Sequence, residues 1–163
     1  MSPAYLAEHA EAARIALDLA ERQVAHLRYT CDTLFSEPID RAWVEKLDKR
    51  EDLVEKIEAF VGRFGRLQDH IGEKLLPAFA RLLGSKTRSL VDVLAYAERM
   101  AWVGSGEEFI GARKLRNLLV HEYLTEPELF LEALLAAKPA TELLFQVVQS
   151  VKQEALSRGL GMA

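Results

Sequence analysis

The sequence is poor in the residues that cross-link a chain or anchor it in a membrane. Cys31 is the only cysteine among 163 residues, which excludes a disulfide within the chain and fits a reducing compartment. No apolar run approaches the ~18 residues that a membrane-spanning helix needs. The first residues also lack the basic start and apolar core of a secretory signal. We therefore expect a cytoplasmic protein that makes no membrane contact.

Basic charge is in short supply as well. Lys and Arg total 21 against 25 for Asp and Glu, which gives a formal net charge of −4. A protein that holds nucleic acid by its overall charge usually carries a net positive charge. Any nucleic-acid chemistry here must therefore rest on a local cluster of cations or on a partner that supplies charge.

Motifs for metals and cofactors are absent. The four histidines are scattered, and the sequence has no HExxH motif, no cysteine pair and no acidic cluster with ligand spacing. It also has no Gly-rich phosphate loop, no nucleophile elbow and no Rossmann fingerprint. We expect a protein that uses neither a metal nor a cofactor.

What the chain does have is the composition of an ordinary globular domain. Hydrophobic residues make up 50% and charged residues 28%, and no repeat, linker or low-complexity segment interrupts them. The length allows one sizeable hydrophobic core. We expect residues 1–163 to form a single domain.

Two long segments have helical periodicity. In residues 6–34 apolar residues recur at spacings of three and four, and Pro38 follows the pattern. Residues 53–82 repeat the same spacing, with Pro77 inside the pattern and Gly84 after it. We expect Pro77 to kink this helix, because proline lacks a backbone donor and clashes with the preceding turn.

The shorter helices are predicted from their caps. Residues 40–49 suit a short helix or the first turns of the next one. Ser89, followed three residues later by an aspartate, can begin a helix that continues to Trp102. Ser105 and Glu108 have the spacing of a capping box, which predicts the start of the next helix.

The last third of the sequence contains two more signals of helix boundaries. Thr125 and Glu128 repeat the capping spacing, so the preceding helix should end near Leu124. Pro139 should then separate a helix from a last one over residues 140–157. No stretch alternates with period two. We predict an all-α fold, an up-and-down helical bundle of four main helices with one or two short extra helices.

The stretch RNLLVHEY, from Arg116 to Tyr123, contains the only asparagine of the chain. On a helical wheel of ~100° per residue it has two faces. One face is predicted to join the core and holds Ala112, Leu115, Leu118 and Leu119. The other face gathers the polar residues Arg113, Arg116, Asn117, His121 and Tyr123.

The polar face suits chemistry on a phosphodiester. Histidine can take or give a proton near neutral pH, and arginine offers a planar fork that matches a phosphate. Asn117 can orient the imidazole or bond a phosphate oxygen. Because Arg116 and His121 point about 140° apart on an ideal helix, only the arginine's length or a bend lets both reach one phosphate.

Plainer readings of the same residues remain open. The two arginines can form a solvated basic strip paired with Glu107 or Glu122. His121 can bond a backbone carbonyl at the helix end. In the second long helix, Asp69 and His70 lie either on a solvated face or close enough to reach the motif helix.

The pattern R-x4-H-x-Y, with a polar residue directly after the arginine and a helical bundle around it, resembles the HEPN superfamily. The spelling of residues 116–123 is most similar to the HepT-like branch of that superfamily. The resemblance implies a homodimer whose motif helices line one cleft, and a metal-independent endoribonuclease that is the toxin of a toxin–antitoxin pair. It also implies a minimal nucleotidyltransferase as antitoxin, which adds AMP to the motif tyrosine.

By this resemblance Arg116 and His121 would be catalytic, Asn117 would support them, and Tyr123 would carry the AMP. Arg113 would help to bind RNA. The residues suggest that His121 removes a proton from a 2′-hydroxyl while Arg116 stabilises phosphoryl charge. DNA, which lacks that hydroxyl, would not be cleaved. A second His121 in a dimer could serve as the acid.

Two other classes of function compete with the ribonuclease. HEPN-type bundles also occur as catalytically silent binding subunits of a nucleotidyltransferase, and the acidic net charge suits that role. A plain structural bundle is the third reading, but it leaves the polar face of the motif helix unexplained.

Overall fold

The computed structural model describes residues 4–121 and 125–161 of the chain, apart from the side chain of His121. Every regular element in this part of the chain is helical, which confirms the all-α prediction. The α-helices are α1 (Ala10–Leu34), α2 (Arg41–Glu45), α3 (Glu51–His70), α4 (Leu76–Leu82), α5 (Leu90–Arg99), α6 (Gly106–His121) and α7 (Pro127–Ser157). The short 3-10 turns are η1 (Ala7–His9) and η2 (Leu47–Lys49), and η3 (Ile71–Leu75) is a π-helical turn.

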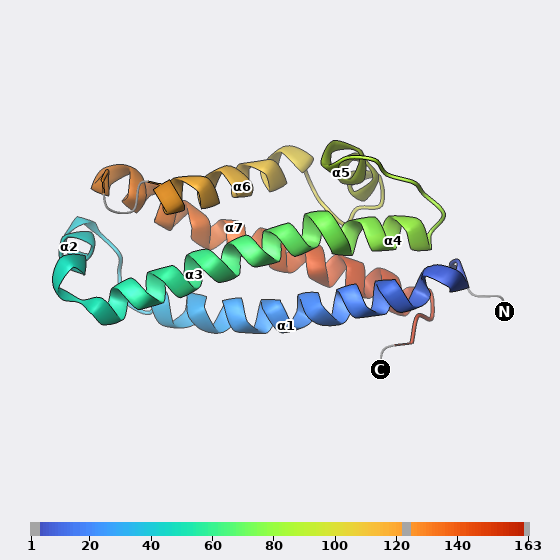
Figure 1. Ribbon diagram of the computed structural model, residues 1–163, viewed down its shortest axis with the longest axis horizontal. Helices are drawn as coiled ribbons and strands as arrows, with labels where there is room; N and C mark the ends of the chain where they lie inside the picture. The colour runs from blue at the N-terminus through green and yellow to red at the C-terminus, as the bar shows by residue number, and fades with distance from the viewer. Residues whose placement is uncertain (1–3, 122–124, 162–163) are drawn as a thin grey trace.

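The long helices run alternately up and down (Figure 1). Helix α1 packs on α3, α3 on α6, α6 on α7, and α7 on α1, so consecutive long helices surround one core. Helices α3 and α4 form one rod with η3 between them. The short α2 lies at one end of the bundle and α5 at the other. This confirms the predicted bundle with two short additions.

The core is filled by the apolar faces that the periodicity predicts. Phe60 and Phe64 are fully buried on α3, and their rings stack with centroids 5.6 Å apart. Phe79 on α4 meets Trp102 edge to face, with the ring centroids 6.2 Å apart. Burial of such rings is the main favourable contribution to packing between helices.

The proline in the second long helix is accommodated by the π-helical turn. Leu76 N–H bonds the carbonyl of Ile71, five residues back, and Pro77 follows directly. Because Pro77 has no N–H to donate, a wider turn at this point relieves its clash with the preceding backbone. Gly84, at φ 85°, then ends the rod as predicted, with Ser85 N–H bonded to the Ala80 carbonyl at 2.8 Å.

Three predicted boundaries are wrong, at the end of α5, at Pro139 and at the start of α7. Helix α5 ends at Arg99 rather than Trp102, because Ala101 adopts φ 61° and Trp102 N–H bonds the Ala97 carbonyl at 2.9 Å. Helix α7 is continuous from Pro127 to Ser157, so Pro139 does not separate two helices.

The reason that α7 continues through Pro139 is its packing. Pro139 is exposed, so the carbonyl that loses its helical donor is on the solvent side. Buried residues on both sides of the proline, among them Ala137 and Thr141, keep the two halves packed on the same core. The start of α7 also differs from the prediction, because Pro127 occupies its first turn and Glu126 rather than Thr125 precedes it.

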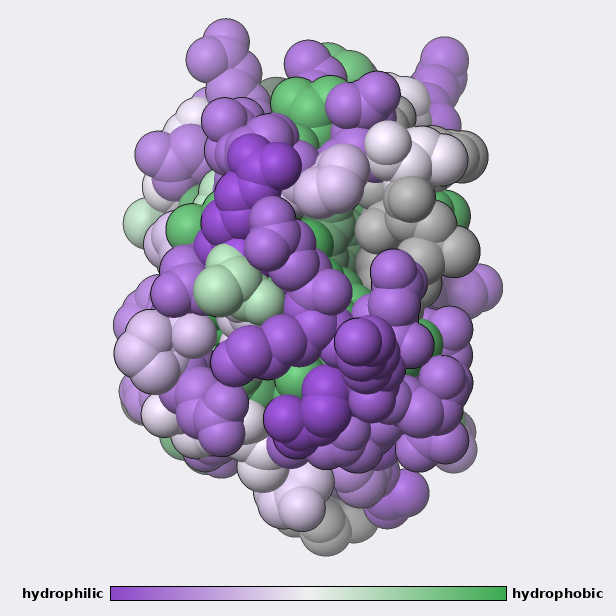
Figure 2. Space-filling view, turned by 90° about the vertical axis from the view of Figure 1, so that its left-hand side faces the viewer, coloured by the Kyte–Doolittle hydropathy of each residue, from purple (hydrophilic) through white to green (hydrophobic). Residues whose placement is uncertain are grey.

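The surface at the α2 end is mainly hydrophilic, and apolar residues show there only in small areas (Figure 2). Among the described residues, no helix is both long and apolar enough to cross a membrane.

Candidate functional site

The motif helix α6 is fixed at its N-terminus by two side-chain caps. Ser105 Oγ accepts a hydrogen bond from Glu108 N–H at 3.3 Å, as the capping spacing predicts. The Glu98 carboxylate of α5 accepts a bond from Gly106 N–H. These bonds satisfy two of the free donors at the helix start and connect α6 to α5.

Helix α6 is held against α3 by a buried polar contact as well as by apolar packing. Gln68 is almost fully buried, and its Nε2 donates to the Ala112 carbonyl at 2.8 Å. Gln68 Oε1 has no hydrogen-bond partner among the described residues. Phe109 and Leu119 fill the apolar contact, but Leu118 is 39% exposed. The predicted core face is therefore wrong at Leu118, which lies beyond the width of the seam that α3 and α7 cover.

Arg116 lies across the backbone of α3. A Cβ built on Gly65 would be 2.7 Å from Arg116 Nε, so the guanidinium occupies the space that any larger residue would need. Arg116 Nη1 lies 3.6 Å from Asp69 Oδ1, and about a third of each side chain is exposed. The arginine is thus oriented by a carboxylate and still reaches solvent.

The other residues of the predicted polar face are distributed as follows. Arg113, one turn before Arg116, is partly exposed and faces α3. Asn117 is exposed. His121 is the last residue of α6, but its side chain is outside the described part of the chain, as is all of Tyr123. The structure therefore brings Arg113 and Arg116 together over α3.

The sequence left open whether Asp69 and His70 reach the motif helix, and the structure gives a different answer for each residue. Asp69 reaches the motif helix and pairs with Arg116. The structure shows no ion pair to Glu107, and the other partner that the sequence left open, Glu122, lies outside the described residues. His70 points the opposite way: its Nε2 lies 2.7 Å from the Ala16 carbonyl of α1, and the ring is buried. His70 thus joins α3 to α1 and has no place in the site.

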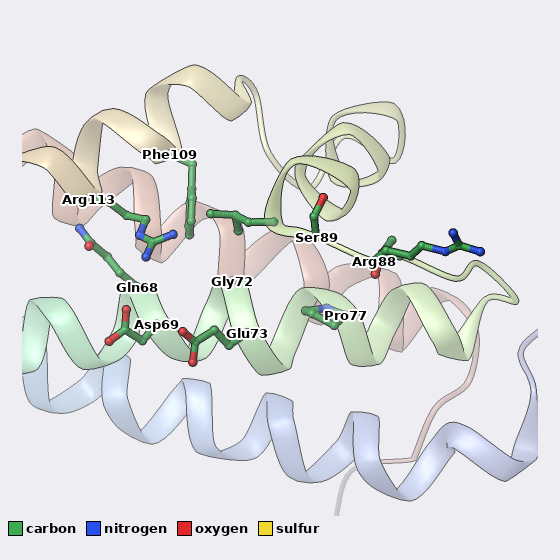
Figure 3. A pocket seen from close by; sticks show the side chains of 11 residues that line it. Gln68, Asp69, Gly72, Glu73, Pro77, Arg88, Ser89, Phe109 and Arg113 are labelled. Carbon is green, nitrogen blue, oxygen red and sulfur yellow. The ribbon is translucent and has the colours of Figure 1, made fainter.

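A pocket of about 330 Å³ adjoins Arg113 and Asp69 (Figure 3). It lies between the α3–α4 rod on one side and α5 and α6 on the other. In Figure 3 the Glu73 and Asp69 side chains lie along the rod, and the Arg113 side chain extends from α6 toward the rod. The remaining lining residues are Gln68, Gly72, Pro77, Thr87, Arg88, Ser89, Leu90 and Phe109.

Sequence reasoning missed Gly65, Gln68 and Glu73. A glycine within a strongly periodic helix is a signal of close approach by another group, so Gly65 could have been found. Gln68 sits in a predicted buried position, but its bond to the Ala112 carbonyl depends on how two distant helices meet. The same holds for Glu73, which the π-helical turn places on the pocket side of the rod.

The chain matches no known family model, no curated protein and no solved structure. Across the described residues, no group of three or more His, Cys, Asp or Glu side chains is arranged to hold a metal ion.

Proposed function

We propose that this protein is a metal-independent endoribonuclease of the HEPN type, the toxin of a toxin–antitoxin pair. The observation that carries the proposal is the position of Arg116. A core-packed helix presents its guanidinium to solvent, an ion pair with Asp69 orients it at 3.6 Å, and His121 follows five residues later on the same helix. A partly exposed, oriented arginine is what binding of a phosphodiester requires.

The reaction would be attack within the RNA chain. His121 removes the proton of a 2′-hydroxyl, whose oxygen bonds the adjacent phosphorus while the bond from phosphorus to the 5′-oxygen breaks. Arg116 stabilises the charge that develops on the phosphoryl oxygens, and Asn117 supports the arrangement. The departing 5′-oxygen takes a proton from a second acid. The products end in a 2′,3′-cyclic phosphate and a 5′-hydroxyl.

A homodimer would supply that second acid as the His121 of the other copy. The outer side of α6 supports such a pairing, because Leu118 is 39% and Val120 is 53% exposed beside the exposed Asn117. Apolar side chains of this size gain from being covered by another surface. Twofold symmetry would then place two motif helices at one cleft.

A minimal nucleotidyltransferase would be the antitoxin. Addition of AMP to Tyr123 would place bulk and negative charge seven residues along the chain from Arg116. Mass spectrometry of protein co-expressed with such a partner should find AMP on Tyr123, and an unmodified tyrosine would count against this part of the proposal.

The decisive test is RNA cleavage by the purified protein in EDTA, after mass spectrometry has verified that Tyr123 carries no AMP. Total tRNA and an unstructured RNA are the substrates, and wild type is compared with His121→Ala and Arg116→Ala. His26→Ala and Arg22→Ala are matched controls, because both residues are exposed on α1. We expect cyclic phosphate ends from wild type and controls, and almost none from the two motif variants. An inert wild type would overturn the enzyme proposal.

The second candidate function is a catalytically silent binding subunit of a nucleotidyltransferase. It is favoured by the Asp69 carboxylate, which offsets the charge of Arg116, and by the net charge of −4. A wild type that leaves every RNA intact but binds the nucleotidyltransferase would support this candidate.

A further inference from the structure

The pocket beside Arg116 is suited to a nucleobase. It shares Asp69 with the Arg116 ion pair, and its Arg113 lies one helical turn from Arg116 on α6. A phosphodiester held by Arg116 would therefore leave the neighbouring nucleotide at the mouth of this pocket. This step rests on the proposed ribonuclease function.

The size and the walls of the pocket fit a planar ring. Its volume of about 330 Å³ falls at the lower end of the ~300–1,000 Å³ that small-molecule sites occupy. Pro77, Leu90 and Phe109 supply apolar lining, and Gly72 lets Leu90 and Phe109 pack closely on the rod, since a Cβ there would lie 3.1 Å from Leu90 Cδ1. The flat faces of a base are its least polar parts, so apolar walls suit them.

The polar groups of the pocket have free bonding capacity. Glu73 is exposed and forms neither an ion pair nor a hydrogen bond with any described residue, and the same is true of Arg113. Within the part of the chain that the structure describes, the 3.6 Å contact with Arg116 is the one ion pair of Asp69. Figure 3 shows the Glu73 and Asp69 carboxylates beside each other on the rod, with the Arg113 guanidinium across from them.

This combination selects among the four bases. An ionised carboxylate only accepts hydrogen bonds, and it is best satisfied by two adjacent N–H donors. Guanine presents such a pair, N1–H and the N2 amino group, on its Watson–Crick edge. Adenine, cytosine and uracil each place an acceptor next to a donor on that edge, and this acceptor would repel the carboxylate. Arg113 can hold the phosphate of the same nucleotide.

We propose that the pocket binds an unpaired guanine next to the cleaved phosphodiester, with Glu73 as the residue that recognises its Watson–Crick edge and Arg113 as the contact to its phosphate. Glu73 is a specificity residue here. It takes no part in proton transfer.

The first readout is binding, which does not depend on cleavage. A fluorescent uridine oligonucleotide with one central guanosine, 2′-deoxy at every residue to prevent cleavage, is compared by anisotropy with the same probe containing adenosine. We expect the guanosine probe to bind wild type about tenfold more tightly, a difference typical of one good bidentate base contact. Glu73→Gln should remove the difference, because an amide offers a donor and an acceptor in place of two acceptors. Glu55→Gln, an exposed carboxylate elsewhere on α3, should retain it.

The second readout maps cleavage sites on an unstructured RNA that contains all four bases. Cuts by wild type and Glu55→Gln should fall next to guanines, and cuts by Glu73→Gln should spread over other bases. Equal binding of the two probes by wild type overturns the guanine pocket, even if RNA is cleaved. Guanine-dependent binding without any cleavage supports the pocket and overturns the ribonuclease, so the two failures are distinguishable.

Discussion

The side chain of Arg116 on α6 lies in the space left by Gly65 on α3. A Cβ at position 65 would stand 2.7 Å from Arg116 Nε, closer than a carbon and a nitrogen can approach without one of them moving. This glycine lets the arginine cross α3 and meet Asp69. The candidate site therefore depends on a residue with no side chain.

Replacing Gly65 should change stability and activity in opposite directions. We expect Gly65→Ala to raise the free energy of unfolding by up to about 1 kcal/mol, since alanine favours helix over glycine. The same change should push Arg116 aside and lower the rate of RNA cleavage about tenfold, the effect of a transition-state loss near 1.4 kcal/mol. Urea denaturation and initial cleavage rates measure the two effects.

Gly62→Ala is the matched control for that experiment. A Cβ there would lie 3.4 Å from its nearest neighbour, Arg66 Nη1, which is an ordinary contact at the end of a flexible side chain. This variant should gain stability and cleave RNA like wild type. If Gly65→Ala also cleaves like wild type, the space at Gly65 has no role in positioning Arg116.

Removing the charge of Asp69 should affect RNA binding more than folding. The ion pair with Arg116 is about a third exposed, and such pairs contribute about 0–1 kcal/mol to stability. We expect Asp69→Asn to tighten binding of a non-cleavable RNA by about two- to fivefold at low salt, because one repulsive charge is lost while the amide oxygen can still accept a hydrogen bond from Arg116 and keep it oriented. Anisotropy titration measures this, and Asp18→Asn, which breaks the Arg22 pair on α1, should leave affinity unchanged. Weaker binding by Asp69→Asn would contradict the prediction.

His70 should prove to be structural. Its buried ring bonds the Ala16 carbonyl, so His70→Ala removes both packing and a hydrogen bond between α3 and α1. We expect the free energy of unfolding, measured by urea denaturation, to fall by about 2 kcal/mol. The folded fraction, quantified by circular dichroism, should cleave RNA at the wild-type rate. A folded His70 variant that has lost cleavage would place this histidine in the site.

Pro139 should destabilise the helix that contains it. Since α7 is continuous and Pro139 is exposed, Pro139→Ala restores a backbone donor without disturbing the core. We expect the free energy of unfolding to rise by about 1–2 kcal/mol, the helix gain less the loss of proline's restraint on the unfolded chain. Pro127→Ala, in the first turn of α7, should change stability little. A fall in stability for Pro139→Ala would mean that the ring contributes packing.

The lone thiol should make stability depend on alkaline pH. Burial raises the pKa of Cys31 above its ordinary value, and its Sγ lies 3.6 Å from Thr141 Oγ1. The folded state thus keeps the thiol neutral at a pH where the unfolded chain has begun to lose that proton. The free energy of unfolding should fall as the pH rises above about 8.5, the ordinary thiol range. The free energy of unfolding of Cys31→Ala should fall less steeply over the same range. Urea denaturation across that range tests this, and equal slopes would contradict it.

The sequence predicted best those features that depend on residues within one or two helical turns of each other. The bundle, the cap at Ser105 and the end of the rod at Gly84 follow from local periodicity and backbone chemistry, and the structure confirms them. The prediction of a break at Pro139 failed because packing on both sides of a proline can outweigh its local cost. Leu118 was wrongly assigned to the core. A helical wheel shows in which direction a side chain points, but not how wide a strip of the helix its neighbours cover.

By itself, then, the sequence determined the helices and the polar residues gathered on α6, because these depend on spacing along one segment. Only the tertiary structure decided that Arg116 meets Asp69, that Gly65 makes room for it, and that Glu73 faces Arg113 across a pocket. Those relationships join residues about forty to fifty positions apart. They are set by the packing of α6 against the α3–α4 rod, where the Gln68 bond to the Ala112 carbonyl and the turn ahead of Pro77 determine which side chains face each other.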